Sequence, residues 1–310
     1  MILIVGGTGV LGREVVAQLL DAGEPVRLLA RTPAKVDDLK QAGAEVVEGD
    51  LLDPLSLARA CDGADRVLAA AHSLLGKGRY ASEAVDGAGN RALIDAAKAA
   101  RVAHFVFISI LGAAPDHPVD FWRTKYGVEQ YLKASGLSYT ILRPSAFMEW
   151  HAHVFNGKAI LENGKTMILG KGTKPRNFVA AADVARFVVL ALRDPRLRDR
   201  TLDVGGPGDF TNNEVAALYG SVAGVTPRVR HMPPVAARGM SIVLKPFQPG
   251  VSRVMYMASL PDDAFSERFD PSPLLAEFPM QLTTLEDLAR ARVAEAGGPA
   301  EVRRRTGAGR

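Results

Sequence analysis

The chain has 310 residues, of which 47% are hydrophobic and 23% are charged. This composition is typical of a folded protein that buries a large core, and it excludes an intrinsically disordered chain. The 38 basic and 34 acidic residues nearly balance, and four of the arginines lie within residues 301–310. Because the rest of the chain has no basic run, we expect no nucleic-acid partner.

The sequence also argues against several kinds of site. Its one cysteine, Cys61, excludes an internal disulfide and a thiolate zinc site. His151 and His153 alternate like a metal pair, but no nearby set of carboxylates and histidines completes the coordination sphere, so we predict no metal site. The apolar N-terminal run is too short to cross a bilayer and lacks signal-peptide features. We therefore expect a cytoplasmic protein without a membrane span, and the Ala-, Arg- and Gly-rich composition indicates a bacterial source.

Six apolar runs alternate with helical patterns over the first half of the chain. Runs that are apolar on successive residues suit parallel strands buried on both faces. The segments between them have apolar residues at spacings of three and four, typical of the helices that cross over between parallel strands. The alternation predicts a doubly wound parallel sheet of the α/β class. We predict strands at 2–5, 25–29, 44–47, 66–70, 105–109 and 139–142, and helices at 12–22, 55–60, 87–100 and 121–134.

Beyond residue 144, glycine- and proline-rich turns separate shorter elements. We expect a helix from Asp183, a strand at 201–204 and a helix that Thr211 caps. The pattern of residues 226–280 mixes strand and helix character and supports no assignment.

These patterns suggest a division into three parts. We predict a nucleotide-binding domain at 1–150 with return segments near 177–205, a smaller α+β substrate region at 151–295, and a disordered Gly-, Ala- and Arg-rich tail at 296–310.

A glycine-rich motif, Gly6-Gly7-Thr8-Gly9-Val10-Leu11-Gly12, follows the first predicted strand and opens the first predicted helix. The first glycine permits a tight turn, the second lets the backbone approach a pyrophosphate, and the third lets helix and strand pack closely. The helix N-terminus adds amide donors and a positive dipole end. This context predicts a Rossmann domain. The cofactor-binding residues that we expect from the motif are Gly6, Thr8, Gly9, Val10, Leu11 and Gly12.

The end of the second predicted strand indicates which dinucleotide is bound. An NAD enzyme usually places Asp or Glu there to bind the ribose hydroxyls, whereas this chain has Arg31. A guanidinium can stack on the adenine and pair with the 2′-phosphate of NADP, with Lys35 as a second cation. Both cations could instead be ordinary solvated charges. We predict NADPH as the preferred cofactor, with NAD as an alternative.

Further candidates follow the other strands, because doubly wound sheets bind ligands at the carboxyl ends of their strands. Asp50 and Leu51 end the third strand, where a carboxylate or the backbone can meet the adenine amino group. His72 and Ser109 are candidate catalytic groups, as a proton donor and an oxyanion-type donor, although each could be an ordinary polar residue. The residues expected to line the nicotinamide end are Ala70, Ala71, Pro144, Ser145 and Phe147.

The sequence resembles the NmrA-like, atypical group of short-chain dehydrogenases, which is related to isoflavone reductases and to photosystem assembly factors. The resemblance covers about residues 1–200. It rests on the glycine motif and on the segments Gly49-Asp50-Leu51-Leu52-Asp53, Phe105-Val106-Phe107-Ile108-Ser109-Ile110-Leu111-Gly112-Ala113, Leu137-Ser138-Tyr139-Thr140-Ile141-Leu142-Arg143-Pro144 and Ala181-Ala182-Asp183-Val184-Ala185.

This resemblance implies a role for Lys125. Standard short-chain dehydrogenases have a proton-donating Tyr four positions before this lysine, but here the residue is Phe121, which has no hydroxyl. Lys125 would hold the nicotinamide ribose, act as the acid as in the isoflavone-reductase type, or be an exposed helix lysine. Ordinary ketoreductase chemistry is therefore not expected.

Two functions follow from the resemblance. The first is an NADPH-dependent oxidoreductase that transfers a hydride to a small quinone, enone or aromatic ketone without a catalytic Tyr. A quinone suits this site because its reduction yields a stabilised phenolate. The alternative is a non-enzymatic NADP(H)-binding regulator or assembly factor, for which Phe121 needs no explanation. A homodimer is one of the oligomeric states that the sequence leaves open.

Overall fold

The computed structural model describes residues 1–261, 264 and 267–307. The chain divides into two compact units, and the second begins at Ser145, six residues before the boundary that we predicted from the sequence. The first unit comprises Met1–Pro144, Val184–Asp203 and Gln248–Gly250, and the second comprises Ser145–Asp183, Val204–Phe247 and Val251–Arg310.

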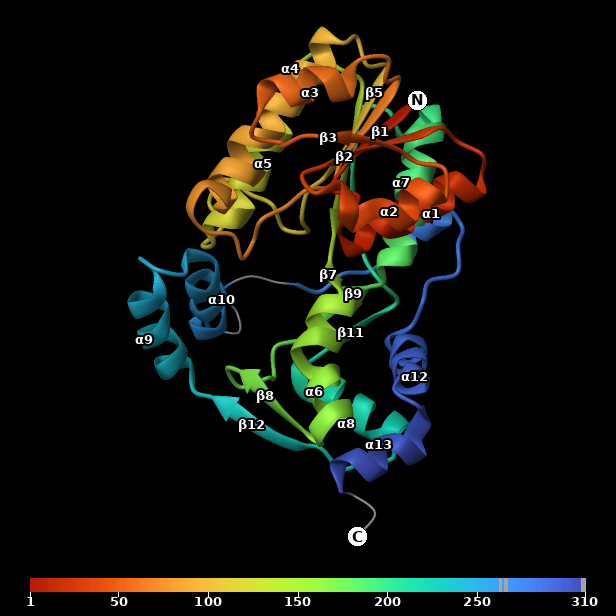
Figure 1. The fold of residues 1–310 in the computed structure, drawn as a ribbon. Helices are drawn as coiled ribbons and strands as arrows, with labels where there is room; N and C mark the ends of the chain where they lie inside the picture. The colour runs from red at the N-terminus through yellow and green to blue at the C-terminus, as the bar shows by residue number, and fades with distance from the viewer. Residues whose placement is uncertain (262–263, 265–266, 308–310) are drawn as a thin grey trace. The chain divides into compact units, whose positions relative to one another are not determined.

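A seven-stranded sheet forms the centre of the first unit (Figure 1), with the strand order β10-β6-β5-β4-β1-β2-β3. The pairings from β3 through β6 are parallel, which confirms the predicted doubly wound α/β fold. The strands are β1 (Ile2–Val5), β2 (Val26–Ala30), β3 (Glu45–Glu48), β4 (Arg66–Ala69), β5 (His104–Ile108), β6 (Tyr139–Pro144) and β10 (Arg200–Val204).

The strand order changes direction at β1. This strand pairs with β2 on one side and with β4 on the other, so the chain builds the sheet outward first in one direction and then in the opposite direction. The carboxyl ends of β1 and β4 are therefore adjacent, with their connections leaving on opposite faces. Such a switch point opens a crevice for a ligand in doubly wound sheets.

Helices cover both faces of this sheet. Figure 1 shows α3, α4 and α5 on one face, and α1, α2 and α7 on the other. A π-helical segment, η3, precedes α4 where we predicted one continuous α-helix. The helices are α1 (Val10–Asp21), η1 (Pro33–Val36), α2 (Asp37–Gln41), α3 (Pro54–Cys61), η2 (Gly78–Tyr80), η3 (Glu83–Gly89), α4 (Asn90–Ala99), α5 (Asp120–Ala134), α7 (Ala181–Arg193) and η5 (Pro195–Leu197).

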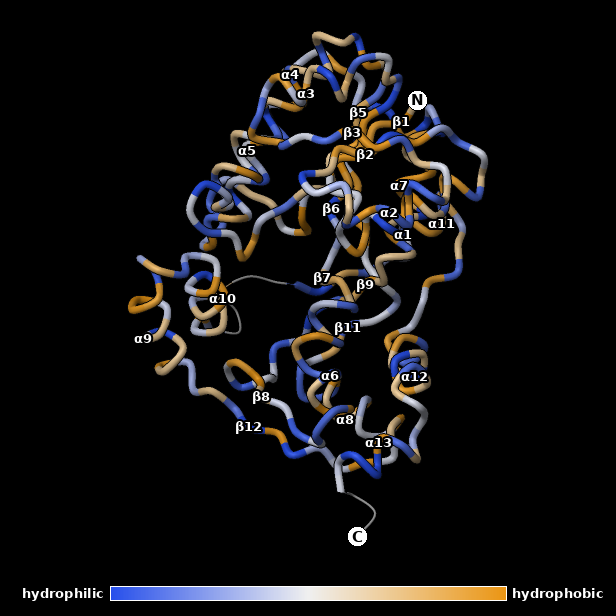
Figure 2. The backbone as a smooth tube through the Cα atoms, viewed as in Figure 1, coloured by the Kyte–Doolittle hydropathy of each residue, from blue (hydrophilic) through white to orange (hydrophobic). Residues whose placement is uncertain are grey.

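The core of the first unit lies along the sheet. Every residue of β1 and β5 is buried, as expected for strands that are apolar on successive residues and covered on both sides. Figure 2 shows the hydrophobic colour concentrated on these central strands. Burial on two faces makes the sheet a rigid platform for the loops at its carboxyl edge.

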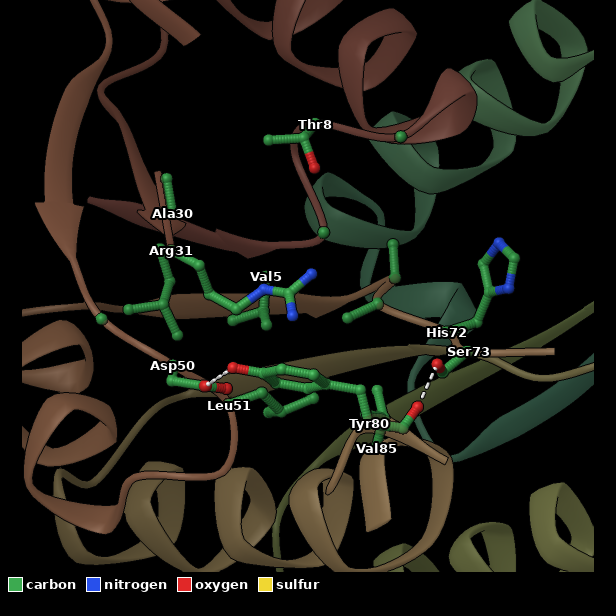
Figure 3. Close-up of a pocket in the computed structure, with 16 residues that line it drawn as sticks. Val5, Thr8, Ala30, Arg31, Asp50, Leu51, His72, Ser73, Tyr80 and Val85 are labelled. Atoms are coloured by element: carbon green, nitrogen blue, oxygen red, sulfur yellow. Dashed lines mark hydrogen bonds between the residues drawn. The ribbon is translucent and has the colours of Figure 1, made fainter. Parts of the chain in front are cut away.

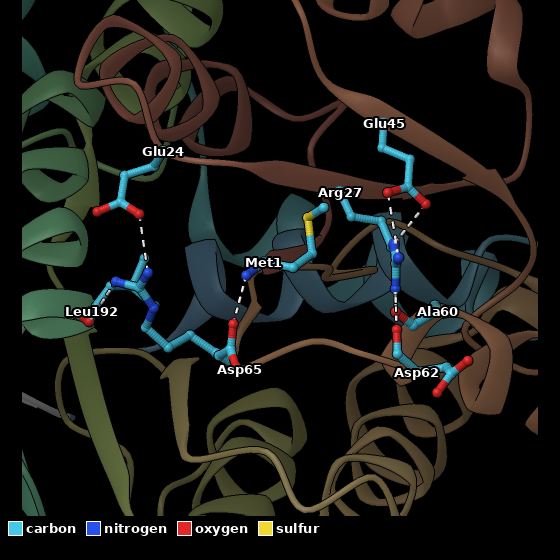
Figure 4. Close-up of polar contacts among 9 residues, drawn as sticks. Met1, Glu24, Arg27, Glu45, Ala60, Asp62, Asp65 and Leu192 are labelled. Atoms are coloured by element: carbon cyan, nitrogen blue, oxygen red, sulfur yellow. Dashed lines mark hydrogen bonds and ion pairs between the residues drawn. The ribbon is translucent and has the colours of Figure 1, made fainter.

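Polar contacts tie the strands to the segments around them (Figure 4). The N-terminal ammonium pairs with Asp65 at 2.6 Å, and Arg27 pairs with Glu45 at 2.8 Å. Arg66 bonds both Glu24, at 3.0 Å, and the Leu192 carbonyl, at 3.3 Å. Leu192 belongs to α7, so Arg66 helps to hold the segment 184–203 in the first unit.

Buried His104 makes the stability of the first unit depend on pH. Its ring lies between the hydroxyls of Ser138, at 3.1 Å, and Thr140, at 3.0 Å. Desolvation, followed by the positive charge of Arg198, lowers the pKa of His104 from 6.5 to about 4. As the pH falls below 6.5 the unfolded chain takes up this proton first, so stability is lost between pH 6.5 and about 4 and is unaffected above.

We expect unfolding of the wild-type protein to cost about 2 kcal/mol less at about pH 5 than at about pH 7 through this group alone. Urea unfolding of the wild type and of His104→Gln at the two pH values measures the contribution. An equal pH dependence in the two proteins would exclude His104 as its source.

The second unit combines helices with two small sheets, which fits the predicted α+β region. Its core joins Met148, Phe178 and Tyr219 from three different elements. The elements are β7 (Ala146–Phe147), η4 (Met148–Gly157), α6 (Lys158–Asn163), β8 (Lys165–Leu169), β9 (Arg176–Val179), β11 (Gly208–Phe210), α8 (Asn212–Ala223), β12 (Arg228–Met232), α9 (Pro234–Leu244), α10 (Pro249–Ser259), α11 (Ser272–Glu277), α12 (Leu285–Glu295) and α13 (Gly298–Thr306).

Two local features of the second unit follow from short-range chemistry. Thr211 caps α8 and forms a capping box with Glu214, which confirms the predicted helix start. Fully buried Asp183, from the Ala181–Ala185 segment, accepts hydrogen bonds from the Thr283 amide at 2.7 Å and its hydroxyl at 2.9 Å. The aspartate of that segment thus fixes the chain just before α12.

The predicted disorder of the tail is wrong for most of its length, because residues 298–306 form α13. This helix packs against α6, α8 and α12, and Val302 is fully buried in the core of the second unit. Glu301 pairs with Arg305 one turn later, which offsets part of the charge of the arginine run. Residues 308–310 of the predicted tail lie outside the described residues.

None of the helices in the described ranges combines the length and the apolar composition that crossing a bilayer requires.

Candidate functional site

A pocket of about 200 Å³ lies in the first unit at the carboxyl ends of β1 to β4 (Figure 3). It occupies the switch point at which the strand order changes direction. Arg31 and Asp50 lie toward one end of the pocket, and His72 lies toward the other. The lining residues are Val5, Gly6, Thr8, Gly9, Leu29, Ala30, Arg31, Gly49, Asp50, Leu51, Ala70, Ala71, His72, Ser73, Tyr80 and Val85.

The loop after β1 has the geometry of a phosphate cradle. Gly6 has a φ of +106°, and a Cβ built on it would lie 2.5 Å from the Ala71 nitrogen. A Cβ on Gly12 would collide with the Gly6 carbonyl, so both positions require glycine. Gly9 precedes α1 without a capping side chain, and the first turn has no acidic residue. The free amides and the positive dipole end at the N-terminus of α1 therefore suit a pyrophosphate.

Three side chains form the end of the pocket beside β2 and β3. The Arg31 guanidinium lies 4.5 Å from the centre of the Tyr80 ring, and the Tyr80 hydroxyl donates a 2.8 Å hydrogen bond to Asp50 (Figure 3). Arg79 contacts the same carboxylate at 3.5 Å. A flat aromatic face, a stacked cation and a second cation match the adenine and 2′-phosphate of NADP.

Sequence reasoning missed Tyr80. It lies in an irregular connection that ends in the short helix η2, far from any strand end. The Tyr80 carbonyl accepts a 2.6 Å bond from Ser73 Oγ, which anchors this connection to the segment after β4. An aromatic residue beside two basic residues in a Gly-rich loop was the only signal available.

Removing the Tyr80 hydroxyl should weaken cofactor binding while leaving the ring in place. Loss of one hydrogen bond to a carboxylate predicts a rise of roughly three- to tenfold in the Kd for NADPH in Tyr80→Phe. Tyr131→Phe is a matched control because the Tyr131 hydroxyl also bonds an aspartate, Asp95, at 2.8 Å on the surface of α5. Fluorescence titration should find the control unchanged, and equal weakening in both variants would contradict the role of Tyr80.

A buried ion pair lies near the His72 end. Lys125 Nζ is 3.1 Å from Asp86 Oδ1 and donates a hydrogen bond of 3.2 Å to the Ile108 carbonyl. The two charged side chains are 4% and 0% exposed, and the ammonium lies 5.0 Å from the centre of the Phe107 ring. Because both side chains lie away from water, each is the nearby counter-ion of the other, and neither could be removed alone without leaving a buried charge unpaired.

Asp86 is positioned by the π-helical segment η3. Its second oxygen accepts bonds from the Ser73 amide at 2.9 Å and the Ser82 hydroxyl at 3.0 Å. Ser73 directly follows His72, so the same carboxylate fixes both Lys125 and the loop that carries His72. Sequence reasoning missed Asp86 because the register of a π-helix is set by packing and has no periodic signature.

His72 lines the pocket, and its side chain is exposed to solvent. Desolvation by the surrounding protein, and next the charge of Lys125, lower the pKa of His72, while Asp86 acts in the opposite direction. A lowered pKa means that the ring is neutral near pH 7. It then offers one N–H donor and one acceptor to a ligand.

The Ser109 hydroxyl already makes a hydrogen bond within the first unit. Its hydroxyl donates to the fully buried Glu129, which Arg143 also contacts through bonds of 2.8 Å and 2.5 Å. This hydrogen is therefore already bonded, and a donor role toward a ligand would require that bond to break. The function of Ser109 as an oxyanion-type donor stays a prediction.

The pocket contains part of the predicted cofactor set. Gly6, Thr8, Gly9, Arg31, Asp50, Leu51, Ala70 and Ala71 line it. Val10, Leu11 and Gly12 begin α1 beside it, Lys35 is exposed on η1, and Pro144 ends β6. Ser145 and Phe147 belong to the second unit, where the Ser145 hydroxyl bonds Asn177 at 2.8 Å. Their contribution to cofactor binding stays a prediction.

Comparison with known proteins agrees with this pocket. Residues 6–195 match the model of a family described as NAD(P)H-binding. An NAD(P)H azoreductase of Xenophilus azovorans is 36% identical over 225 residues, which are 72% of this chain and 74% of the relative. The photosystem II assembly factor Ycf39 of Trieres chinensis is 32% identical over 232 residues, 75% of this chain and 72% of that protein.

A solved structure shows the same fold. The NADPH-dependent quinone oxidoreductase of Escherichia coli, crystallised with NADPH, superposes with a TM-score of 0.73 at 24% identity, over 94% of this chain and 99% of that one. The family model and the azoreductase relative confirm the predicted nicotinamide cofactor as NAD(P)H. The chain belongs to the NAD(P)H-binding family, within the NmrA-like and isoflavone-reductase group that its sequence resembles.

Proposed function

We propose that the protein is an NADPH-dependent reductase that delivers a hydride to a quinone, an enone or an aromatic ketone. The observation that carries this proposal is the polarity of the pocket. Arg31 and Tyr80 form one end, and His72, with the buried Lys125 and Asp86 near it, marks the other. An extended dinucleotide bound along the pocket would have its phosphorylated adenosine at the first end and its nicotinamide at the second.

The basic end accounts for a preference for NADPH over NADH. Arg31 offers a planar fork of donors that matches a phosphate, and β2 ends without the acid that binds an unphosphorylated ribose. Arg79, exposed near Asp50, adds positive charge around the same position. Both arginines favour the ligand that carries the additional phosphate.

The opposite end provides charge stabilisation for a reduction. Bound NADPH supplies a hydride equivalent from C4 of its nicotinamide. The Lys125 ammonium contributes a fixed positive charge in a region of low dielectric, where it stabilises negative charge that develops on an acceptor oxygen. The neutral His72 ring offers an N–H hydrogen bond to that oxygen, and solvent at the exposed ring can supply the final proton.

The residues around Lys125 favour an electron-poor acceptor. Phe121 occupies the position of the usual tyrosine, is buried, and has its ring centre 5.6 Å from Lys125 Nζ. The position of the usual catalytic tyrosine therefore offers no phenol to protonate an unactivated ketone. A quinone needs less assistance, because two-electron reduction yields a stabilised oxyanion that is protonated afterwards. The names of an azoreductase relative and a quinone oxidoreductase neighbour support an acceptor of this type.

The alternative is a nucleotide-binding assembly factor or regulator. Phe121 favours this reading, because a protein that only binds the nucleotide needs no proton donor. The Ycf39 relative is similar in identity to the azoreductase relative. Binding of NADPH alone cannot separate the two functions, so turnover must be measured.

Steady-state oxidation of NADPH with a panel of quinones, enones and aromatic ketones tests the proposal. We expect the protein to reduce at least one quinone, with one NADPH oxidised for each hydroquinone formed. The rate of this reduction should be higher with NADPH than with NADH. A protein that binds NADPH tightly but oxidises none with any acceptor would support the regulator instead.

A further inference from the structure

Helix α9 of the second unit presents apolar side chains to solvent. Val235, Ile242 and Val243 are 83%, 65% and 68% exposed, and Phe247, just after the helix, is 73% exposed. In the part of the chain that the structure describes, these are four of the five most exposed large apolar side chains. Part of the α9 tube has the hydrophobic colour in Figure 2. Isolated exposed apolar residues are common, but a cluster on one short segment indicates an interaction surface.

The orientation of α9 is the reverse of that of an ordinary surface helix. Its buried residues include the small Ala237 and the polar Ser241, whose hydroxyl is satisfied by the Arg238 carbonyl at 2.7 Å. Val235, Ile242 and Val243 lie at spacings of seven and eight, so they share the opposite face. The helix thus buries its small residues and exposes its large apolar ones, which a free surface would not favour.

The chain segment that contains this helix carries charge of one sign. The sequence holds no Asp or Glu between Glu214 and Asp262. Arg228 and Arg230 on β12, Arg238 on α9 and Lys245 just after it are exposed. On the segment 235–247, the exposed residues Val235, Arg238, Ile242, Val243, Lys245 and Phe247 form what we call the basic apolar face, and Arg228 and Arg230 precede it in the chain.

We propose that the basic apolar face docks the protein onto an anionic phospholipid bilayer. A helix that lies in the interface inserts its apolar side chains at the boundary between headgroups and acyl chains, and flanking cations pair with anionic headgroups. A bilayer surface does not require a partner of complementary shape, so a single exposed helix can bind it. A second copy of this chain fits less well, because a symmetric dimer would bring the same acid-free basic segments together.

Co-sedimentation of the full chain with vesicles tests this inference without any measurement of reductase activity. We expect binding to vesicles of phosphatidylcholine mixed with phosphatidylglycerol, little binding to phosphatidylcholine alone, and weaker binding as salt is raised. Equal binding to the two kinds of vesicle, or binding to neither, would overturn the proposal.

Two variants and two matched controls locate the surface. Ile242→Asp should lower the vesicle partition coefficient by about tenfold or more, and Lys245→Glu by roughly fivefold or more. Leu55→Asp, at an apolar side chain that is 72% exposed on α3, and Lys133→Glu, at an exposed lysine on α5, make the same charge changes and should keep the wild-type value.

Circular dichroism melting checks that each variant folds, and both target positions are exposed enough to tolerate the change. Wild-type vesicle binding by both target variants would exclude this face. Analytical ultracentrifugation that shows a dimer broken by Ile242→Asp, with no lipid binding by the wild type, would assign the face to a second copy and overturn the lipid proposal. Lipid-independent capture of an acidic protein by this face, with no binding to anionic vesicles, would do the same.

Discussion

Replacing Lys125 by Met is expected to lower the free energy of unfolding by about 3 to 5 kcal/mol, because it leaves the fully buried Asp86 carboxylate without its counter-ion. The methionine fills nearly the same volume, so the loss reports the uncompensated charge and not a cavity. Chemical denaturation of the wild type and of Lys125→Met measures it. A loss below about 1 kcal/mol would contradict this prediction, because it would mean that removing the lysine leaves no costly unpaired charge in the interior.

The double variant Lys125→Met with Asp86→Asn separates stability from catalysis. It removes both charges together, so most of the lost stability should return. Quinone reduction should nevertheless remain about 100-fold slower than in the wild type, because the positive charge that stabilises the acceptor oxygen is absent. The Kd for NADPH is the control. We expect it to change by less than about threefold, since neither residue lines the pocket and the asparagine side-chain oxygen can still accept the hydrogen bond from the Ser73 amide. Recovery of wild-type turnover in the stable double variant would exclude an electrostatic role for Lys125.

The second large effect concerns discrimination between the two nicotinamide cofactors. Arg31→Ala should raise the Kd for NADPH by about 10- to 100-fold, the effect of losing charged hydrogen bonds of about 1.5 to 3 kcal/mol. The Kd for NADH should rise much less, because NADH lacks the 2′-phosphate and would lose only the stacking of the guanidinium on its adenine. Titration of wild type and variant with both cofactors measures the preference directly.

Two further variants sharpen this test. Arg31→Lys keeps the charge but loses the planar fork and the stack on Tyr80, so we expect intermediate binding of NADPH. Lys35→Ala removes an exposed cation that does not line the pocket and should alter the Kd by less than about threefold. A parallel loss of NADPH and NADH binding in Arg31→Ala would show that Arg31 maintains the pocket and does not recognise the phosphate.

Much of the first unit was predictable because its signals are local. Strands buried on both faces are apolar on successive residues, and the glycines of the first loop are needed by backbone contacts a few residues apart or across β1 and β4. The end of β2 is likewise a local feature, so Arg31 was assigned from its neighbours alone. Gly6, Arg31 and Asp50 line one pocket, and their roles in cofactor binding stay predictions.

The parts that could not be predicted depend on contacts between distant segments. Tyr80 reaches Asp50 only because Ser73 bonds the Tyr80 carbonyl and anchors an irregular loop. Asp86 meets Lys125 only because η3 packs against α5. The C-terminal segment shows the opposite error. Its Arg-rich composition predicts disorder, but buried Val302 helps to hold α13 in the core of the second unit.

Single-turnover oxidation of NADPH deuterated stereospecifically at C4 tests the central claim most directly. The protein is loaded with either labelled form, mixed with the quinone that gives the fastest turnover, and followed by the absorbance of the reduced nicotinamide. Hydride delivery within one fixed pocket predicts slower oxidation with one label and an unchanged rate with the other. Oxidation that is insensitive to either label, or no oxidation above that seen without protein, would contradict the proposed reductase.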